Sequence, residues 1–160
     1  MMAGGRFICQ EFAVKARAER VKYILKLLKG NAYSYADICF KKICKDLFWD
    51  CDTEKRITIN GYNRIFKPYG FAKKLINMTY KYFYIFKDET KQEIDFSICE
   101  CPLDSIIIGH TDNDARWTNI TVTKYNEIQN IITKQLQGDK YSDLKKEIGG
   151  LAFDCNWLNN

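Results

Sequence analysis

Apolar residues recur with helical spacing towards both ends of the chain and with strand-like spacing in its middle, and this order limits the available folds. The helical pattern predicts helices over 13–29, 34–50, 71–79, 123–136 and 142–148. Runs rich in β-branched and aromatic residues predict strands over 56–59, 62–66, 80–86, 93–99, 104–109 and 120–123, with an edge strand over 151–158. Strands and helices do not alternate regularly, which disfavours a Rossmann-like fold and predicts an α+β fold.

Two hairpins are expected to build the sheet. Asn60-Gly61 separates two β-prone runs, and this dipeptide is typical of a tight two-residue hairpin turn. The segment 80–86 then turns at 88–90 into 93–99, where apolar and polar residues alternate. The prediction is a single compact α+β domain over 1–160, with two N-terminal helices, a central antiparallel sheet built from hairpins, and C-terminal helices.

The segment 13–29 has the spacing of an amphipathic helix. Its predicted core-facing residues are Val14, Ala18, Val21, Leu25 and Leu28, and a different face carries Lys15, Lys22, Lys26 and Lys29. Lysines along a helix can bind successive phosphates with sequence-independent, salt-dependent affinity. A solvated helix face explains them equally well, because lysine is abundant here, with 19 residues against six arginines. The next helix is expected to begin at Ser34, spaced from Asp37 like a capping box.

Charge is divided unevenly along the chain. Residues 1–91 contain 19 Lys and Arg against 9 Asp and Glu, a balance of +10, whereas 92–160 contain 6 against 11, a balance of −5. Together they give the net charge of +5. Because the predicted hairpin 80–99 crosses this boundary, we expect a basic region and an acidic region of one domain.

Basic and aromatic residues are interleaved most densely between Tyr62 and Lys87. The basic residues there are Arg64, Lys67, Lys73, Lys74, Lys81 and Lys87. Alternate residues of a strand share a face, so a strand over 80–86 would present one aromatic surface made of Tyr80, Tyr82, Tyr84 and Phe86. Such a surface can stack unpaired bases, or it can pack beneath the helices as core.

The segment Gly109–Asp114 follows a predicted buried strand, a position where functional loops often lie. It contains the only histidine of the chain, His110, together with Asp112 and Asp114. These side chains can ligate a hard metal ion or act as a general base. A polar turn, in which Asp and Asn side chains bind their own backbone, is the favoured explanation of the segment.

The chain contains seven cysteines. Those within the second predicted helix, Cys39 and Cys44, are expected in the core. No C-x-x-C zinc motif is present, and a composite metal site would require the fold to gather Cys99, Cys101, Cys155 and His110. No signal-peptide pattern or membrane-spanning apolar run is found, so we expect a cytoplasmic protein with mostly free, buried thiols.

No nucleotide-binding, hydrolase or zinc-protease motif is present, which favours a non-enzymatic role without a cofactor or metal. We expect the basic, aromatic-rich region to bind a nucleic acid or a nucleoprotein complex. The predicted contact residues are Lys15, Lys22, Lys26, Lys29, Arg64, Lys67, Lys73, Lys74, Tyr80, Tyr82 and Tyr84. Abundant Lys, Ile, Asn and Tyr, encoded by A/T-rich codons, suggest a phage or mobile-element accessory protein, such as an inhibitor of a host defence system.

Two alternatives stay open. The first is a protein–protein interaction module or small subunit, with Trp117 and Trp157 as candidate anchors. The second is a small metal-dependent nuclease that uses the His110 loop. A winged-helix arrangement with 80–99 as the wing is disfavoured, because the Asn60-Gly61 hairpin stands where a recognition helix belongs.

Overall fold

The computed structural model describes residues 14–59, 61–90, 93–138 and 142–157. The first part contains α2 (Val14–Gly30), the short 3-10 helix η1 (Tyr35–Asp37) and α3 (Phe40–Leu47). The middle part contains β1 (Lys55–Ile59), β2 (Tyr62–Phe66), α4 (Pro68–Ile85) and α5 (Lys87–Thr90). The last part contains α6 (Ser105–Gly109), η2 (Trp117–Asn119), α7 (Val122–Gln135), α8 (Ser142–Ile148) and α9 (Leu151–Trp157). The fold is α+β, as predicted.

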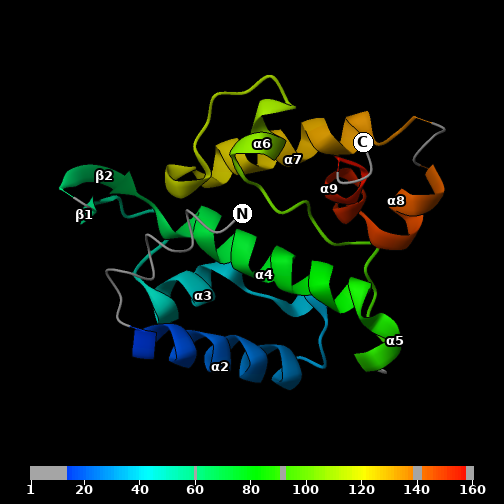
Figure 1. Cartoon of the computed structure of the whole chain (residues 1–160), viewed down its shortest axis with the longest axis horizontal. Coiled ribbons are helices and arrows are strands. Elements are labelled where there is room, and N and C mark those ends of the chain that lie inside the picture. Colours follow the sequence, from blue (N-terminus) through cyan, green and yellow to red (C-terminus); the bar gives the residue numbers. More distant parts are fainter. Residues whose placement is uncertain (1–13, 60, 91–92, 139–141, 158–160) are drawn as a thin grey trace.

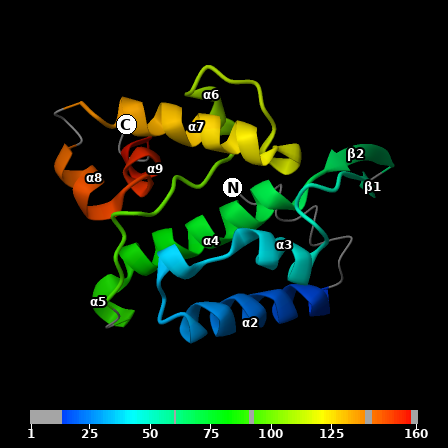
Figure 2. The ribbon, with the colours of Figure 1, turned by 180° about the vertical axis from the view of Figure 1, so that it is seen from behind.

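The long helix α4 runs through the middle of the molecule. In Figure 1 it lies between α2 and α3 on one side and α6, α7 and α9 on the other, and Figure 2 shows the same order from behind. One hydrophobic core joins these helices and includes Leu28, Ile43, Ile76, Ile132 and Leu151. At Gly70 a Cβ atom would lie 2.0 Å from the Trp117 carbonyl oxygen, so only glycine allows α4 and η2 to pack this closely.

The hairpin predicted at Asn60-Gly61 is confirmed. Strands β1 and β2 pair antiparallel from Lys55 opposite Phe66 to Ile59 opposite Tyr62. Gly61 has φ +79°, the left-handed conformation that this turn needs. The hairpin projects from the helical body in both ribbon views (Figure 1, Figure 2).

The strand predicted over 80–86 is wrong, because this segment continues α4. Pro68 begins the helix at a position where its missing N–H is not needed. Tyr80 then packs inward against the rings of Tyr35, Phe83 and Phe96, and its hydroxyl donates to the Tyr33 carbonyl at 2.8 Å. These tertiary contacts override the β propensity of the aromatic residues.

The predicted strand 104–109 is also a helix. The Asp104 carboxylate accepts hydrogen bonds from the backbone N–H groups of Ile106 and Ile107, both at 2.9 Å, and so caps α6. The segment 93–99 forms no strand; Asp95 instead accepts from the Ser97 N–H at 2.9 Å and folds a local turn. The second hairpin expected over 80–99 is therefore absent, and the sheet of the described residues consists of β1 and β2 alone.

The remaining differences lie at the C-terminal end. The predicted strand 120–123 is replaced by the start of α7, which Thr121 caps through its hydroxyl. The helix predicted over 142–148 is confirmed as α8. The predicted edge strand over 151–158 is wrong, because residues 151–157 form α9. Gly149, with φ +57°, lets α8 turn directly into this last helix.

The first helix is confirmed, but of its predicted core-facing residues only Leu28 is buried among the described side chains, and those of Val14 and Ala18 lie outside them. Ile24 and Leu28 are buried, with Tyr23 and Leu27 partly buried beside them. Val21 and Leu25, expected in the core, are each 49% exposed, since the buried face lies nearer to Ile24. The second helix is also confirmed only in part.

At Ser34 no side-chain cap forms, and η1 and α3 are separated by an extended break at Ile38 and Cys39. Cys44 is buried as expected, whereas Cys39 is exposed because it stands at the start of α3. Within the described residues, no helix has the length and apolar character needed to cross a membrane.

Candidate nucleic-acid interface

The β1–β2 hairpin is anchored to the body by one aromatic residue. Phe66, at the base of β2, is buried with ring centroids 5.9 Å from Phe48, 5.5 Å from Trp49 and 6.3 Å from Phe71. Aromatic pairs of this kind hold their partners in a defined geometry. The outer part of the hairpin can therefore be solvent-exposed while its base stays fixed.

The hairpin is basic on both of its faces. Residues 55–67 contain four basic and no acidic residues. Directly opposite residues share a face of a two-stranded ribbon, so Arg64 and Lys55 lie on the face of Phe66, and Arg56 lies on the other. Arg56 and Arg64 are exposed, and Tyr62, beside the turn, is 71% exposed.

The two lysines at the base of the hairpin are held by neighbouring groups. The Lys55 Nζ atom lies 4.6 Å from the Trp49 ring centroid, a cation–π contact. Lys67, one of the predicted contact residues, is half-buried, with its Nζ atom 3.8 Å from a carboxylate oxygen of Glu54. Lys55 is nevertheless exposed, as are Arg56 and Arg64.

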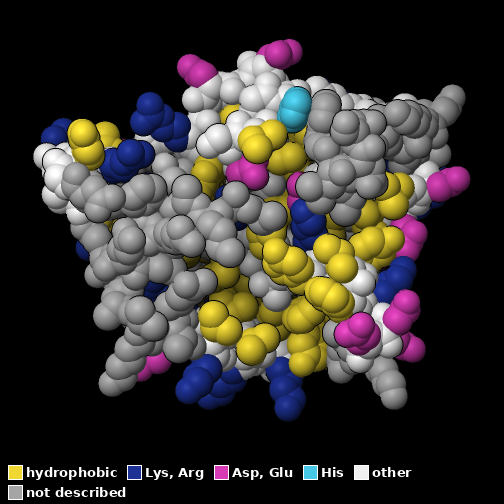
Figure 3. Space-filling view, viewed as in Figure 1, with side chains coloured by type: hydrophobic (Ala, Val, Ile, Leu, Met, Phe, Trp, Pro, Cys, Tyr) yellow, Lys and Arg dark blue, Asp and Glu magenta, His cyan; other side chains and the backbone are white. Residues whose placement is uncertain are grey.

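The predicted lysines of α2 lie on the surface. Lys22, Lys26 and Lys29 are exposed, and the side chain of Lys15 lies outside the described residues. Figure 3 shows basic side chains at the end of the molecule that carries the hairpin and along α2. Acidic side chains gather at the opposite end, near α5 and α8, and at the top above α6 (Figure 3).

Two predicted contact residues point into the protein instead. Lys73 is buried, with its Nζ atom 2.8 Å from Glu100 Oε2 and 3.7 Å from the Phe40 ring centroid. Burial lowers the pKa of Lys73, and the Glu100 carboxylate opposes this shift. Lys74 is half-buried over the Trp117 ring at 4.3 Å, and burial lowers its pKa as well. Neither ammonium group is placed to bind a phosphate on the surface.

The predicted aromatic surface of Tyr80, Tyr82 and Tyr84 does not form. On α4 these residues point in different directions: Tyr80 is fully buried, and Tyr82 is 48% exposed. Tyr84 is half-buried, and its hydroxyl donates to Glu147 at 3.1 Å. A helix turns by about 100° per residue, so residues two apart cannot share a face.

A buried polar network around Glu100 is the main feature that sequence reasoning missed. Glu100 Oε2 accepts from Tyr125 OH at 2.8 Å and from Tyr35 OH at 3.2 Å, in addition to Lys73. Asn77 connects the two tyrosines: its Oδ1 accepts from Tyr35 at 2.7 Å, and its Nδ2 donates to Tyr125 at 3.0 Å. The only signal in the sequence is a set of polar residues inside apolar helical patterns.

The network is electrostatically closed. Burial, and then the Glu100 carboxylate, raise the pKa of both Tyr35 and Tyr125, so both hydroxyls stay protonated and serve as donors. Among the described residues, no buried side-chain nitrogen or oxygen lacks a hydrogen-bond partner. This network joins η1, α4 and α7 through specific hydrogen bonds.

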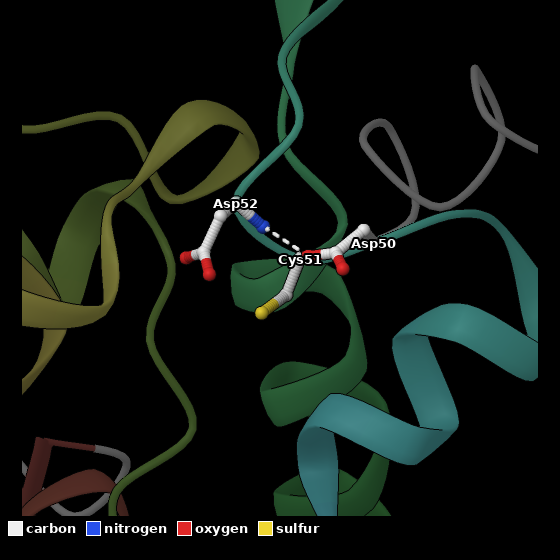
Figure 4. A group of neighbouring side chains, drawn as sticks. All are labelled: Asp50, Cys51 and Asp52. Carbon is white, nitrogen blue, oxygen red and sulfur yellow. Dashed lines mark hydrogen bonds between the residues drawn. The ribbon is translucent and has the colours of Figure 1, made fainter.

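One group of described residues has the spacing of metal ligands. Ligand atoms of Asp50, Cys51 and Asp52, in the turn after α3, all lie within 4.8 Å of one another (Figure 4). The turn is closed by its own hydrogen bond, from the Asp52 N–H to Asp50 Oδ1 at 3.1 Å. Burial, and then the two carboxylates, raise the pKa of the Cys51 thiol, which opposes the thiolate form that binds metal. We therefore interpret the cluster as an acidic turn and not as a metal site.

The other candidate metal ligands are not gathered. His110, Asp112 and Asp114 are all exposed in the turn after α6, and the described residues bring them into no three-ligand group. Cys99 and Cys101 are buried, and among the described residues they belong to no group of three metal-ligating side chains. The side chain of Cys155 lies outside the described residues. The Asn113 Oδ1 atom accepts from the Ala115 N–H at 2.9 Å, as in a polar turn.

Trp117 and Trp157 are the candidate anchors for a protein partner. Trp117 is buried and stacks on Phe71 with ring centroids 6.2 Å apart, so it belongs to the core. The side chain of Trp157 lies outside the described residues.

Comparison of the chain with protein-family models, with curated proteins and with solved structures finds no match.

Proposed function

We propose that this protein binds a nucleic acid, alone or in a nucleoprotein complex, through the β1–β2 hairpin and without catalysing a reaction. The supporting observation is the combination of position and charge: a projecting ribbon with four basic and no acidic residues over 55–67. A two-stranded ribbon fits the major groove of duplex DNA, where phosphates line both walls. Arg56 and Arg64, on opposite faces, suit such a groove.

The exposed ring of Tyr62 adds a second mode of contact. An aromatic side chain can stack on an unpaired base, which contributes about 1–3 kcal/mol per base. Binding to single strands would use this ring, whereas binding to a duplex would use the arginines. A small protein of this kind would act by occlusion, in keeping with the accessory or inhibitory role expected from composition.

Fluorescence anisotropy with labelled random duplex DNA, single-stranded DNA and RNA, over a salt series, tests the proposal. We expect affinity that falls steeply with salt, since bound arginines release counterions. Arg56→Glu should weaken binding about tenfold at low salt and reduce the salt slope by about one or two. The matched variant Lys146→Glu makes the same charge change on α8 and should alter binding little. No binding at about 50 mM salt, or equal effects of the two variants, would overturn the proposal.

A further inference from the structure

Helices α2 and α4 expose apolar side chains that no described element covers. Val21 and Leu25 of α2 are each 49% exposed, and on α4 Tyr82 is 48% and Ile85 53% exposed. Figure 3 shows hydrophobic side chains gathered over α2 and over the C-terminal half of α4, on one face of the molecule. We name these four residues the α2–α4 apolar face. Exposed apolar side chains gathered on one face are typical of interaction sites.

The spacing of the face matches a helical partner. Val21 and Leu25 are four residues apart, and Tyr82 and Ile85 are three apart, so each pair stands on one side of its helix. Towards the N-terminus of α4, the row of Tyr82 and Ile85 continues through Met78, Leu75 and Phe71. Their spacings of four and three are the pattern of a helix–helix seam. An amphipathic helix binds such a surface through anchors at i, i+3, i+4 and i+7.

The charge beside the face selects the partner. Lys22, Lys26 and Lys29 are exposed on α2 next to Val21 and Leu25, at positions that helix geometry places in an adjacent row. The sequence of α4 contains no acidic residue, and in the described side chains of α2 the single acid, Glu19, precedes the face. The α2 border of the face is therefore positive, whereas Asp88 and Glu89 of α5 follow Ile85 at the far end of α4. A partner with carboxylates along the α2 border matches this charge.

We propose that the α2–α4 apolar face binds an acidic amphipathic helix of a partner protein. Leucine-like anchors of that helix cover Val21, Leu25, Tyr82 and Ile85, and its flanking carboxylates pair with the α2 lysines. This site shares no residue with the hairpin, so it can succeed or fail independently of nucleic-acid binding.

Fluorescence anisotropy with two synthetic peptides tests this assignment on the full chain. Both peptides form about five turns of helix, roughly 18 residues, with the same leucine stripe. One carries Glu and the other Lys at the flanking positions. We expect the acidic peptide to bind with a dissociation constant in the range of about 1–50 μM, and the basic peptide to bind at least tenfold more weakly.

Variants identify the surface. Leu25→Asp should weaken the acidic peptide at least tenfold, whereas Ile106→Asp, at an exposed isoleucine on α6, should not. Lys26→Glu should weaken it about fivefold and reduce its salt dependence, whereas Lys146→Glu should not. Circular dichroism melts confirm that each variant is folded.

Several results would overturn the proposal. These are absence of binding, equal binding of the two peptides, and equal effects of the face variants and their controls. A dimer that Leu25→Asp converts to a monomer, seen by light scattering, would assign the face to a second copy. Binding to anionic vesicles that Leu25→Asp abolishes, without peptide binding, would assign it to a membrane surface.

Discussion

The two sides of α4 differ in what their residues contact: the inner side buries polar residues among apolar ones, and the outer side leaves apolar residues exposed. The side facing the core contains Lys73, Asn77 and Lys81, at spacings of four. The outward side ends in the exposed Tyr82 and Ile85, and its charged residue Lys74 packs over the Trp117 ring. The partners available, rather than hydropathy alone, therefore decide which residues of a helix are buried.

Every polar group of the inner side has a partner in another element. Lys73 forms an ion pair with Glu100, and the Lys81 Nζ atom lies 2.6 Å from Oδ2 of Asp154 in α9. Asn77 joins tyrosines from η1 and α7. The inner side thus connects several elements through specific hydrogen bonds, while the outer side is left with apolar area that a second molecule can cover.

Removing Glu100 should have the largest effect on this comparison, because it leaves the buried Lys73 without its carboxylate. Glu100→Ala is expected to lower the free energy of unfolding by about 3 kcal/mol, the lower end for a broken buried ion pair, since Glu100 is itself partly exposed. Urea unfolding followed by circular dichroism measures this change.

The control for that experiment is Glu147→Ala, which breaks the exposed pair of Lys87 and Glu147 at 2.9 Å. Exposed pairs are screened by water, so we expect little change in unfolding. Equal losses from the two variants would mean that the inner pair stabilises the fold no more than a surface pair does.

Asn77→Ala should have the next largest effect. Asn77 is fully buried, and its loss leaves Tyr35 OH and Tyr125 OH with fewer partners in the core. We expect the free energy of unfolding to fall by about 2 kcal/mol. Asn126→Ala, an exposed position on α7, is the matched control and should leave unfolding almost unchanged. A similar result for both would remove the special role of the network.

The turn signal and the helical spacing of apolar residues predicted the fold best. The Asn60-Gly61 turn specified the hairpin, because few dipeptides adopt the required backbone conformation. The helical spacing of 13–29, 123–136 and 142–148 was also sufficient to find α2, α7 and α8. Such features depend on residues close in the sequence, so a single sequence contains the information.

Features that depend on distant residues were not predictable. The segment 80–86 has a strand-like composition, yet it is helical because Tyr80 packs against Tyr35 and Phe96 from other parts of the chain. Lys73 looked like a phosphate ligand because Glu100, its partner, is 27 residues away. Other predicted contact residues, such as Arg64 and Lys22, are exposed as expected. They stand in the hairpin and the first helix, which local sequence patterns predicted.

High pH should weaken the inner side progressively. Tyr35 and Tyr125 have a raised pKa in the folded protein, mainly through burial, so they keep their protons where unfolded tyrosine, with a pKa of about 10, loses them. The folded state then binds more protons than the unfolded state, and the stabilisation present below about pH 10 is lost as the pH rises. The expected slope is about 1.4 kcal/mol per pH unit for each such tyrosine.

Urea unfolding between about pH 9 and 11, with tyrosinate absorbance as a second probe, measures this slope. Tyr125→Phe removes one of the two hydroxyls and should make the slope smaller by about one tyrosine. An unchanged slope in Tyr125→Phe would contradict the assignment of the effect to the tyrosines that bind Glu100.

Substitution on the outer side should have the smallest effect on stability. Tyr82 is 48% exposed and makes no contact that the core needs, so Tyr82→Ser is expected to change the free energy of unfolding by less than about 0.5 kcal/mol. The same variant should weaken the acidic peptide several-fold, because it removes apolar area from the α2–α4 apolar face. A loss of stability close to that of Asn77→Ala would mean that this side is already covered in the free protein. If Tyr82→Ser instead weakens peptide binding and leaves the free energy of unfolding unchanged, the inner side of α4 serves folding and the outer side serves association.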